Sequence, residues 1–187
     1  MPPPESAPES PLDRGLRVPA PSGPDIMWAP WRMAYISAEK DHGHEGPACV
    51  FCDLPAERDD ERTYILHRGR LAFLIMNLYP YNNGHLMAVP YAHVDSLRLL
   101  DAETLTEMVQ LVQRGPEVIG EAMRPQGFNV GVNEGRAAGA GIADHVHMHL
   151  VPRWVGDTNF MPALGDTRVM PQHLDETYAL LRPGFAS

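Results

Sequence analysis

Hydrophobic and polar positions change their spacing along the chain, and this change predicts an alternation of strands and helices. Short runs rich in apolar and aromatic residues predict strands at residues 63–67, 70–78, 85–90, 127–133 and 145–151. Asn83-Gly84 lies between the second and third of these runs and indicates a tight turn. Small residues fill the interval between the last two runs, which predicts a flexible loop there.

A helical period follows Asp101. Apolar residues recur there at i, i+3, i+4 and i+7, namely Leu105, Met108, Val109 and Val112. Asp101 is the expected N-cap of this helix, and Gly115-Pro116 should kink or break it. A last helix is expected at 171–182. The order hairpin, helix, hairpin predicts an α+β domain with an antiparallel β-sheet and helix packing on one side.

The two ends of the chain differ in composition from the middle. Residues 1–25 are rich in Pro, Ser and Glu, which predicts a disordered tail, because such a segment buries little apolar area against its ordering entropy. The aromatic segment at 26–36 should dock on the domain or on a second subunit. We expect residues 26–187 to form a single domain that includes this segment and a C-terminal extension.

Charge and composition narrow the class of protein. The formal net charge is −9, which argues against a general nucleic-acid or acidic-membrane surface, because such surfaces need clustered positive charge. No run approaches the roughly 20 apolar residues that span a bilayer. We therefore expect a soluble cytoplasmic protein. Its two cysteines cannot build a disulfide framework, which leaves metal binding, redox chemistry or packing.

Three of the nine histidines alternate in one segment, at His145, His147 and His149. On a strand these side chains share one face, and the apolar residues between them share the other. A polar strand face with satisfied histidines is the simplest interpretation. Two further interpretations are metal-dependent catalysis and nucleophilic attack by a neutral imidazole nitrogen, for which a second group fixes the tautomer.

The segment His-Val-His-Met-His-Leu-Val at 145–151 resembles the signature of the histidine-triad (HIT) family, in which three histidines alternate with hydrophobic residues. The resemblance continues in "NLYPYNNGHLMAVPYAHV", "GFNVGVNEG" and "PRWVGDTNF". The last of these is similar to the dinucleoside-polyphosphate-cleaving branch. "MWAPWRMAYI" and "NLYPYN" are similar to the family's bacterial diadenosine tetraphosphate phosphorylases.

This resemblance implies a HIT-like fold with a C-terminal triad strand, a homodimer and a catalytic His147. His147 would attack the α-phosphorus of a nucleotide to form a covalent nucleotidyl-histidine, which phosphate or water then releases. His149 would contact the phosphate or leaving group, and His145 would bind zinc or orient its neighbour. The expected substrate is diadenosine tetraphosphate or a related purine dinucleoside polyphosphate. The alternatives are a hydrolase of purine nucleoside phosphoramidates or AMP esters, and a zinc-stabilised nucleotide-binding or interaction module.

The resemblance also implies a set of nucleotide-binding residues. Asn77 matches a position that contacts ribose, and Asn133 matches one that contacts phosphate. The positions that line the base pocket are Val50, Phe51, Leu54, Ile75 and Leu78. Where the family often has Gln and then Ser or Thr, this chain has Gly141-Ile142, so backbone N–H groups at Gly139 to Gly141 are expected to contact phosphate instead. Arg153 is the leading candidate for a phosphate-binding arginine.

Cys49 and Cys52 have the C-x-x-C spacing of half a zinc site. In zinc-bearing members of the family the other two ligands match His93 and His145 here, which implies a structural Cys₂His₂ zinc site. The alternatives are a redox pair, two thiols without metal, and His42 or His44 in place of His93. A divalent cation could also enter with the phosphates of the substrate.

Overall fold

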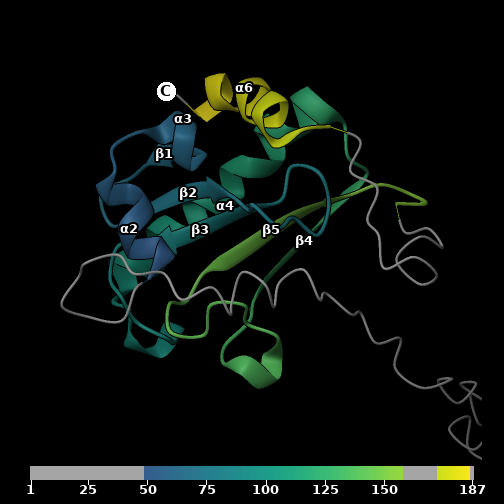
Figure 1. The fold of residues 1–187 in the computed structure, drawn as a ribbon. Coiled ribbons are helices and arrows are strands. Elements are labelled where there is room, and N and C mark those ends of the chain that lie inside the picture. The colour runs from purple at the N-terminus through teal and green to yellow at the C-terminus, as the bar shows by residue number, and fades with distance from the viewer. Residues whose placement is uncertain (1–48, 158–171, 186–187) are drawn as a thin grey trace, which may run out of the picture.

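The structure is a computed structural model that describes residues 49–157 and 172–185. Its five strands are β1 (Ile65–Arg68), β2 (Ala72–Met76), β3 (Leu86–Pro90), β4 (Gly127–Val132) and β5 (Met148–Arg153). They form one antiparallel sheet in the order β1-β2-β3-β5-β4 (Figure 1). The α-helices are α2 (Val50–Ala56), α3 (Asp60–Thr63), α4 (Ala102–Met123) and α6 (Leu174–Phe185), with 3₁₀ turns η1 (Leu97–Leu99) and η2 (Arg136–Ala138). The α+β class predicted from the sequence is confirmed.

The sheet is covered on both faces, by different helices. Leu74 and Met76 of β2 belong to a core cluster with residues of α4 and α6. Phe73 and Ile75 point the other way and join a second cluster with Cys49 and Phe51 at the start of α2. Side chains of a strand alternate between faces, so the unbroken apolar run of β2 matches a strand buried on both sides. The prediction of helix packing on one side is met by α4, which Figure 1 shows behind the sheet.

The expectation was that Gly115-Pro116 kinks or breaks helix α4, and the helix continues through this dipeptide, so the break does not occur. An interior proline lacks the N–H for one helical hydrogen bond, and its ring crowds the carbonyl of residue i−4, so the surrounding structure must offset this cost. Packing against the sheet holds the helix together at this point. A Cβ on Gly115 would lie 2.2 Å from Cδ2 of Leu150 in β5, so only a glycine lets the helix approach the strand this closely. Asp101 is the N-cap, as predicted, and its carboxylate accepts a bond from the Thr104 N–H.

The other predicted elements match the structure to within a few residues, with one instructive difference. Strand β5 begins at Met148, so His145 and His147 lie in the segment just before it. There the Val146 N–H donates to the Val94 carbonyl, 2.7 Å away, instead of to a strand partner. The loop at 134–144 contains η2, and the last helix is placed three residues later than expected. Of the described helices, none combines the length and apolar character needed to cross a bilayer.

The predictions for the tail at 1–25 and for the aromatic segment at 26–36 fall outside the described residues.

Candidate active site and metal cluster

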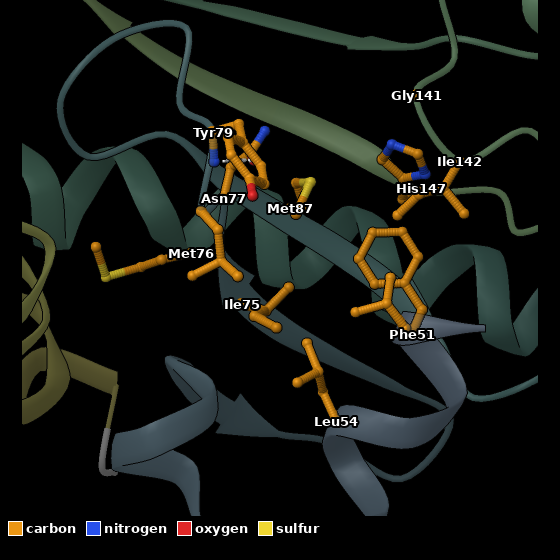
Figure 2. A pocket seen from close by; sticks show the side chains of 12 residues that line it. Phe51, Leu54, Ile75, Met76, Asn77, Tyr79, Met87, Gly141, Ile142 and His147 are labelled. Carbon is orange, nitrogen blue, oxygen red and sulfur yellow. Dashed lines mark hydrogen bonds between the residues drawn. The ribbon is translucent and has the colours of Figure 1, made fainter. Parts of the chain in front are cut away.

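A pocket opens on the α2 face of the sheet, beside the triad segment. Its lining consists of Val50, Phe51, Leu54, Ile75, Met76, Asn77, Leu78, Tyr79, Met87, Gly141, Ile142 and His147. Figure 2 shows Phe51 and Ile142 beside His147 at one end and Asn77 and Tyr79 at the other. The lining is mostly apolar, which is the usual character of a pocket that takes a small organic ligand. All five residues predicted to line a base pocket are among these residues.

His147 is 2% exposed, and Phe51 packs on it with ring centroids 5.0 Å apart. Its Nδ1 lies 2.9 Å from the main-chain carbonyl oxygen of His145. A carbonyl oxygen can only accept, so Nδ1 carries the proton and the neutral ring holds its lone pair on Nε2. The nitrogen that carries the lone pair is the one that can act as a nucleophile. In this structure a main-chain carbonyl therefore leaves the lone pair of His147 on Nε2.

His149 is the first triad residue inside β5, and its ring meets that of His147 edge-on at 4.7 Å. Its Nδ1 lies 2.9 Å from Nε2 of His85, which is 1% exposed. The sequence offered one sign of this contact: His85 follows the Asn83-Gly84 turn and begins the strand that pairs with β5. Their pairing could not be foreseen because the two residues are 64 positions apart.

Cys49, Cys52, His93 and His145 converge on one point, with a ligand atom from each within 4.8 Å of the others. Nδ1 of His145 lies 3.3 Å from Sγ of Cys49 and 3.7 Å from that of Cys52. Nδ1 of His93 lies 3.4 Å from Sγ of Cys52. A tetrahedral zinc with ordinary bond lengths separates its ligand atoms by roughly 3.3–3.8 Å, so this arrangement fits the ion.

The protonation of the cluster also suits a cation. The Pro90 carbonyl oxygen lies 2.9 Å from Nε2 of His145, so Nε2 carries the proton and the lone pair on Nδ1 faces the sulfurs. Burial lowers the pKa of His145 to about 4, which keeps the ring neutral at pH 7. Burial and the neighbouring Cys49 raise the pKa of Cys52 to about 11. A divalent cation would reverse this second shift by stabilising thiolates.

Asn77 lines the pocket and is 7% exposed, and it also caps a turn. Its Oδ1 accepts from the Tyr79 N–H at 2.9 Å, and its Nδ2 donates to Nδ1 of His85 at 3.3 Å. The amide retains one lone pair and one hydrogen beyond these two bonds. A structural role and contact with a sugar hydroxyl are therefore compatible at this residue.

Of the other residues predicted to contact phosphate, only some lie at the pocket. Gly141 lines the pocket, whereas Gly139 ends η2 outside its lining. Asn133 follows Val132, the register partner of Met148, so it comes directly after the end of the pairing between β4 and β5, and it is not among the residues that line the pocket. Arg153 lies at the far end of β5 from His147, where Nε and Nη2 of its guanidinium donate to Asp157 and Nη1 donates to Asn129. The structure therefore does not bring Arg153 to the pocket.

Four residues line the pocket but were not predicted as binding residues, namely Met76, Tyr79, Met87 and Ile142. Met87 is the register partner of Ile75 across β2 and β3. Knowledge of this register would have predicted that Met87 lines the pocket beside Ile75, but the register cannot be read from the sequence. Ile142 was noticed as a departure from the family pattern. It packs against the core cluster of Cys49 and Phe51.

A mostly apolar pocket that presents the lone pair of a histidine is typical of an enzyme active site. The model of the HIT domain matches residues 59–155. The AP-4-A phosphorylase of Mycobacterium tuberculosis (strain CDC 1551 / Oshkosh) is 41% identical over 164 residues, which cover 86% of this chain and 84% of that protein. The chain belongs to the HIT family.

Other relatives are more distant. The bis(5'-nucleosyl)-tetraphosphatase [asymmetrical] of Schizosaccharomyces pombe is 30% identical over half of each chain. Among solved structures, a Zn-bound histidine triad family protein from Mycobacterium smegmatis superimposes with a TM-score of 0.61 at 28% identity. The match covers 74% of this chain and 94% of that protein.

Proposed function

We propose that this protein is an enzyme that cleaves dinucleoside polyphosphates such as diadenosine tetraphosphate at an α-phosphate, through a covalent nucleotidyl-His147. The observation that carries the proposal is the bond from Nδ1–H of His147 to the His145 carbonyl, which leaves the lone pair on Nε2 of a pocket-lining ring. The AP-4-A phosphorylase at 41% identity and the tetraphosphatase relative support this substrate class.

In the proposed first step, Nε2 of His147 forms a bond to the α-phosphorus and the bond to the bridging oxygen breaks. The departing nucleoside polyphosphate, ATP in this case, leaves with the electron pair, and His149 would contact the phosphate or this group. In the second step an oxygen of inorganic phosphate or water attacks the same phosphorus and the P–N bond breaks. Phosphate gives ADP and water gives AMP.

The base would lie in the apolar part of the pocket, between α2 and β2. Val50, Phe51 and Leu54 come from α2, while Ile75 and Leu78 come from β2 and the residues after it. Asn77 would contact the ribose with its remaining hydrogen-bonding capacity. Backbone N–H groups near Gly141 and the side chain of Asn133 are the proposed phosphate contacts. Since Arg153 is engaged by Asp157, charge could also come from a divalent cation carried by the substrate.

We also propose that Cys49, Cys52, His93 and His145 hold a structural zinc ion. The ligand separations and the tautomer of His145 support this assignment, as does the zinc-bound M. smegmatis neighbour. Zinc would tie the start of α2 to the triad segment and take no part in the bond changes. The site needs reduced thiols, which agrees with the predicted cytoplasmic location.

We further propose a homodimer formed through β4. Strand β4 lies at one end of the described sheet. One of its edges pairs with β5, and no described strand pairs with its other edge. Asn129 to Gly131 are exposed, and Val130 is 55% exposed. Pairing of two β4 edges across a two-fold axis would cover this backbone and bury the valine.

The test is to incubate the protein with diadenosine tetraphosphate, with and without inorganic phosphate, and to separate the products. ADP with ATP, formed only with phosphate, would identify a phosphorylase, whereas AMP with ATP, or two ADP, would identify a hydrolase. His147→Asn should abolish nearly all turnover while nucleotide affinity persists. Unchanged activity in this variant would refute the nucleophile assignment. No turnover by the wild type would favour another leaving group or a binding module.

A further inference from the structure

Beyond the triad, a chain of hydrogen bonds runs from the backbone of the β2–β3 turn to His149. The Tyr81 N–H donates to Nδ1 of His85 at 3.0 Å, and the Asn77 amide donates to the same nitrogen at 3.3 Å. On the other side of the ring, Nε2 of His85 lies 2.9 Å from Nδ1 of His149. His85 is therefore the link between a main-chain amide and a triad histidine.

The direction of each bond follows from the Tyr81 amide, which can only donate. Nδ1 of His85 must accept, so the proton of this ring is on Nε2 and points at His149. Nδ1 of His149 must then accept in turn, which puts the proton of the neutral His149 ring on Nε2. The orientation of Asn77 agrees, because its Oδ1 is held by the Tyr79 N–H and its NH₂ faces His85.

The turn that starts this chain is firmly held. The ring of Tyr81 stacks on His85 at 4.8 Å and 24°. Asn82 donates to the Pro152 carbonyl and to Asp157, and Asn83 is bonded to Gln172 and Thr177 near α6. Gly84 has a φ of 73°, and a Cβ there would lie 3.0 Å from Sδ of Met123. A turn fixed at so many points can impose one tautomer on the ring that follows it.

We propose that His85 is a positioning residue that makes Nε2 of His149 a proton donor toward the leaving group. This inference rests on the proposed function for its catalytic consequence, but not for the tautomer itself. His85 would touch neither substrate nor reacting atoms. It would instead ensure that His149 presents N–H, while the His145 carbonyl ensures that His147 presents a lone pair. Two neighbouring triad imidazoles would thus hold opposite roles, one set by a main-chain carbonyl and the other by the ring of His85.

Two substitutions test the two ring nitrogens of His85 separately. An asparagine oxygen can replace Nδ1, so His85→Asn keeps the bond from Tyr81 and loses the one to His149. A glutamine amide can replace Nε2, so His85→Gln keeps the donor to His149 and loses the acceptor for Tyr81. His85→Asn loses the bond to His149, and His85→Gln loses the acceptor for both Tyr81 and Asn77. A purely structural role therefore predicts losses in both variants that are at least as large in His85→Gln. His67→Gln is the control, because His67 bonds only to the Phe185 carbonyl at the far end of the sheet in the described structure.

The first measurement is the tautomer of His149, by ¹⁵N NMR of the full-length protein as purified. We expect N–H at Nε2 in the wild type, in His67→Gln and in His85→Gln, and a shift toward Nδ1–H in His85→Asn. N–H at Nδ1 in the wild type would overturn the proposal, as would an unchanged tautomer in His85→Asn. This readout does not depend on any activity, so it remains decisive if the proposed function fails.

The second measurement is turnover of diadenosine tetraphosphate and of the 4-nitrophenyl ester of AMP, whose leaving group needs little protonation. With the first substrate, His85→Asn should lower kcat by about 10²-fold, the usual scale of a lost general acid, with little change in KM. The loss should be much smaller with the ester and in His85→Gln. Equal losses on both substrates, or equal losses in both variants, would overturn the positioning role.

Discussion

The close approach of α4 to β5 can be tested with two glycines of one helix. In Gly115→Ala the new Cβ would lie 2.2 Å from Cδ2 of Leu150, well inside the 3.4 Å at which ordinary contact begins. In Gly120→Ala nothing lies within 4 Å of the new atom. Both changes gain the same helix propensity, about 0.5–1 kcal/mol relative to glycine. Only the first must also displace a core side chain that is 0% exposed.

Overpacking of this kind costs about 1–3 kcal/mol. Gly120→Ala should therefore raise the free energy of unfolding by about 0.5–1 kcal/mol, and Gly115→Ala should fall about 1–3 kcal/mol below it. Urea denaturation monitored by circular dichroism measures both values, and equal m-values would show that the unfolding reaction is unchanged. Leu150→Ala combined with Gly115→Ala should destabilise less than the sum of the two single changes.

Equal changes in the free energy of unfolding for Gly115→Ala and Gly120→Ala would refute this reasoning. They would mean that Leu150 can move away from the new Cβ without an energetic cost. Activity offers a second readout, because Leu150 is the neighbour of His149 in β5. If the helix pushes the strand, Gly115→Ala should lower turnover as well as stability, whereas Gly120→Ala should leave turnover unchanged.

The other proposals give direct expectations. Elemental analysis of protein purified without chelators should find one zinc per chain, and Cys49→Ser should lower both zinc content and melting temperature; zinc-free wild-type protein would remove the site. In chelator-treated protein, the lowered pKa of His145 means that the unfolded state binds more protons between pH 6.5 and about 4. Stability should therefore fall as pH decreases through that window and change no further from this residue below it. Val130→Lys should convert a dimer to a monomer in sedimentation experiments, and a monomeric wild type would refute the β4 interface.

The two faces of β2 and the N-cap of α4 were predictable because they depend on local sequence. The side chains of β2 alternate between two buried faces with a period of two, and Asp101 needs only its position before an apolar period. The path of α4 past Pro116 was not predictable from local rules. The helix packs there against Leu150, which is distant in the chain and reaches the helix only once the sheet has formed.

In the candidate site, too, some features could be predicted from the sequence and others could not. The family resemblance indicated the pocket residues of α2 and β2, and the structure places them around one cavity. Arg153 shows the limit of this approach, because a charge four residues away competes for it. Asp157 is visible in the sequence as an i, i+4 partner, and the pair forms in the structure. A phosphate role for Arg153 would require that bond to open.

An alternating pattern of histidines cannot say which ring nitrogen carries the proton, and the chemistry depends on that choice. In this fold, main-chain carbonyls determine which ring nitrogen of His145 and of His147 carries the proton. The Pro90 carbonyl holds the proton of His145 away from the cysteines, and the His145 carbonyl holds that of His147 away from Nε2, the proposed nucleophile. Residue 145 thus has two separable parts, a side chain suited to bind metal and a carbonyl that orients His147. Replacing its side chain would remove the ligand but leave the orienting carbonyl in the chain.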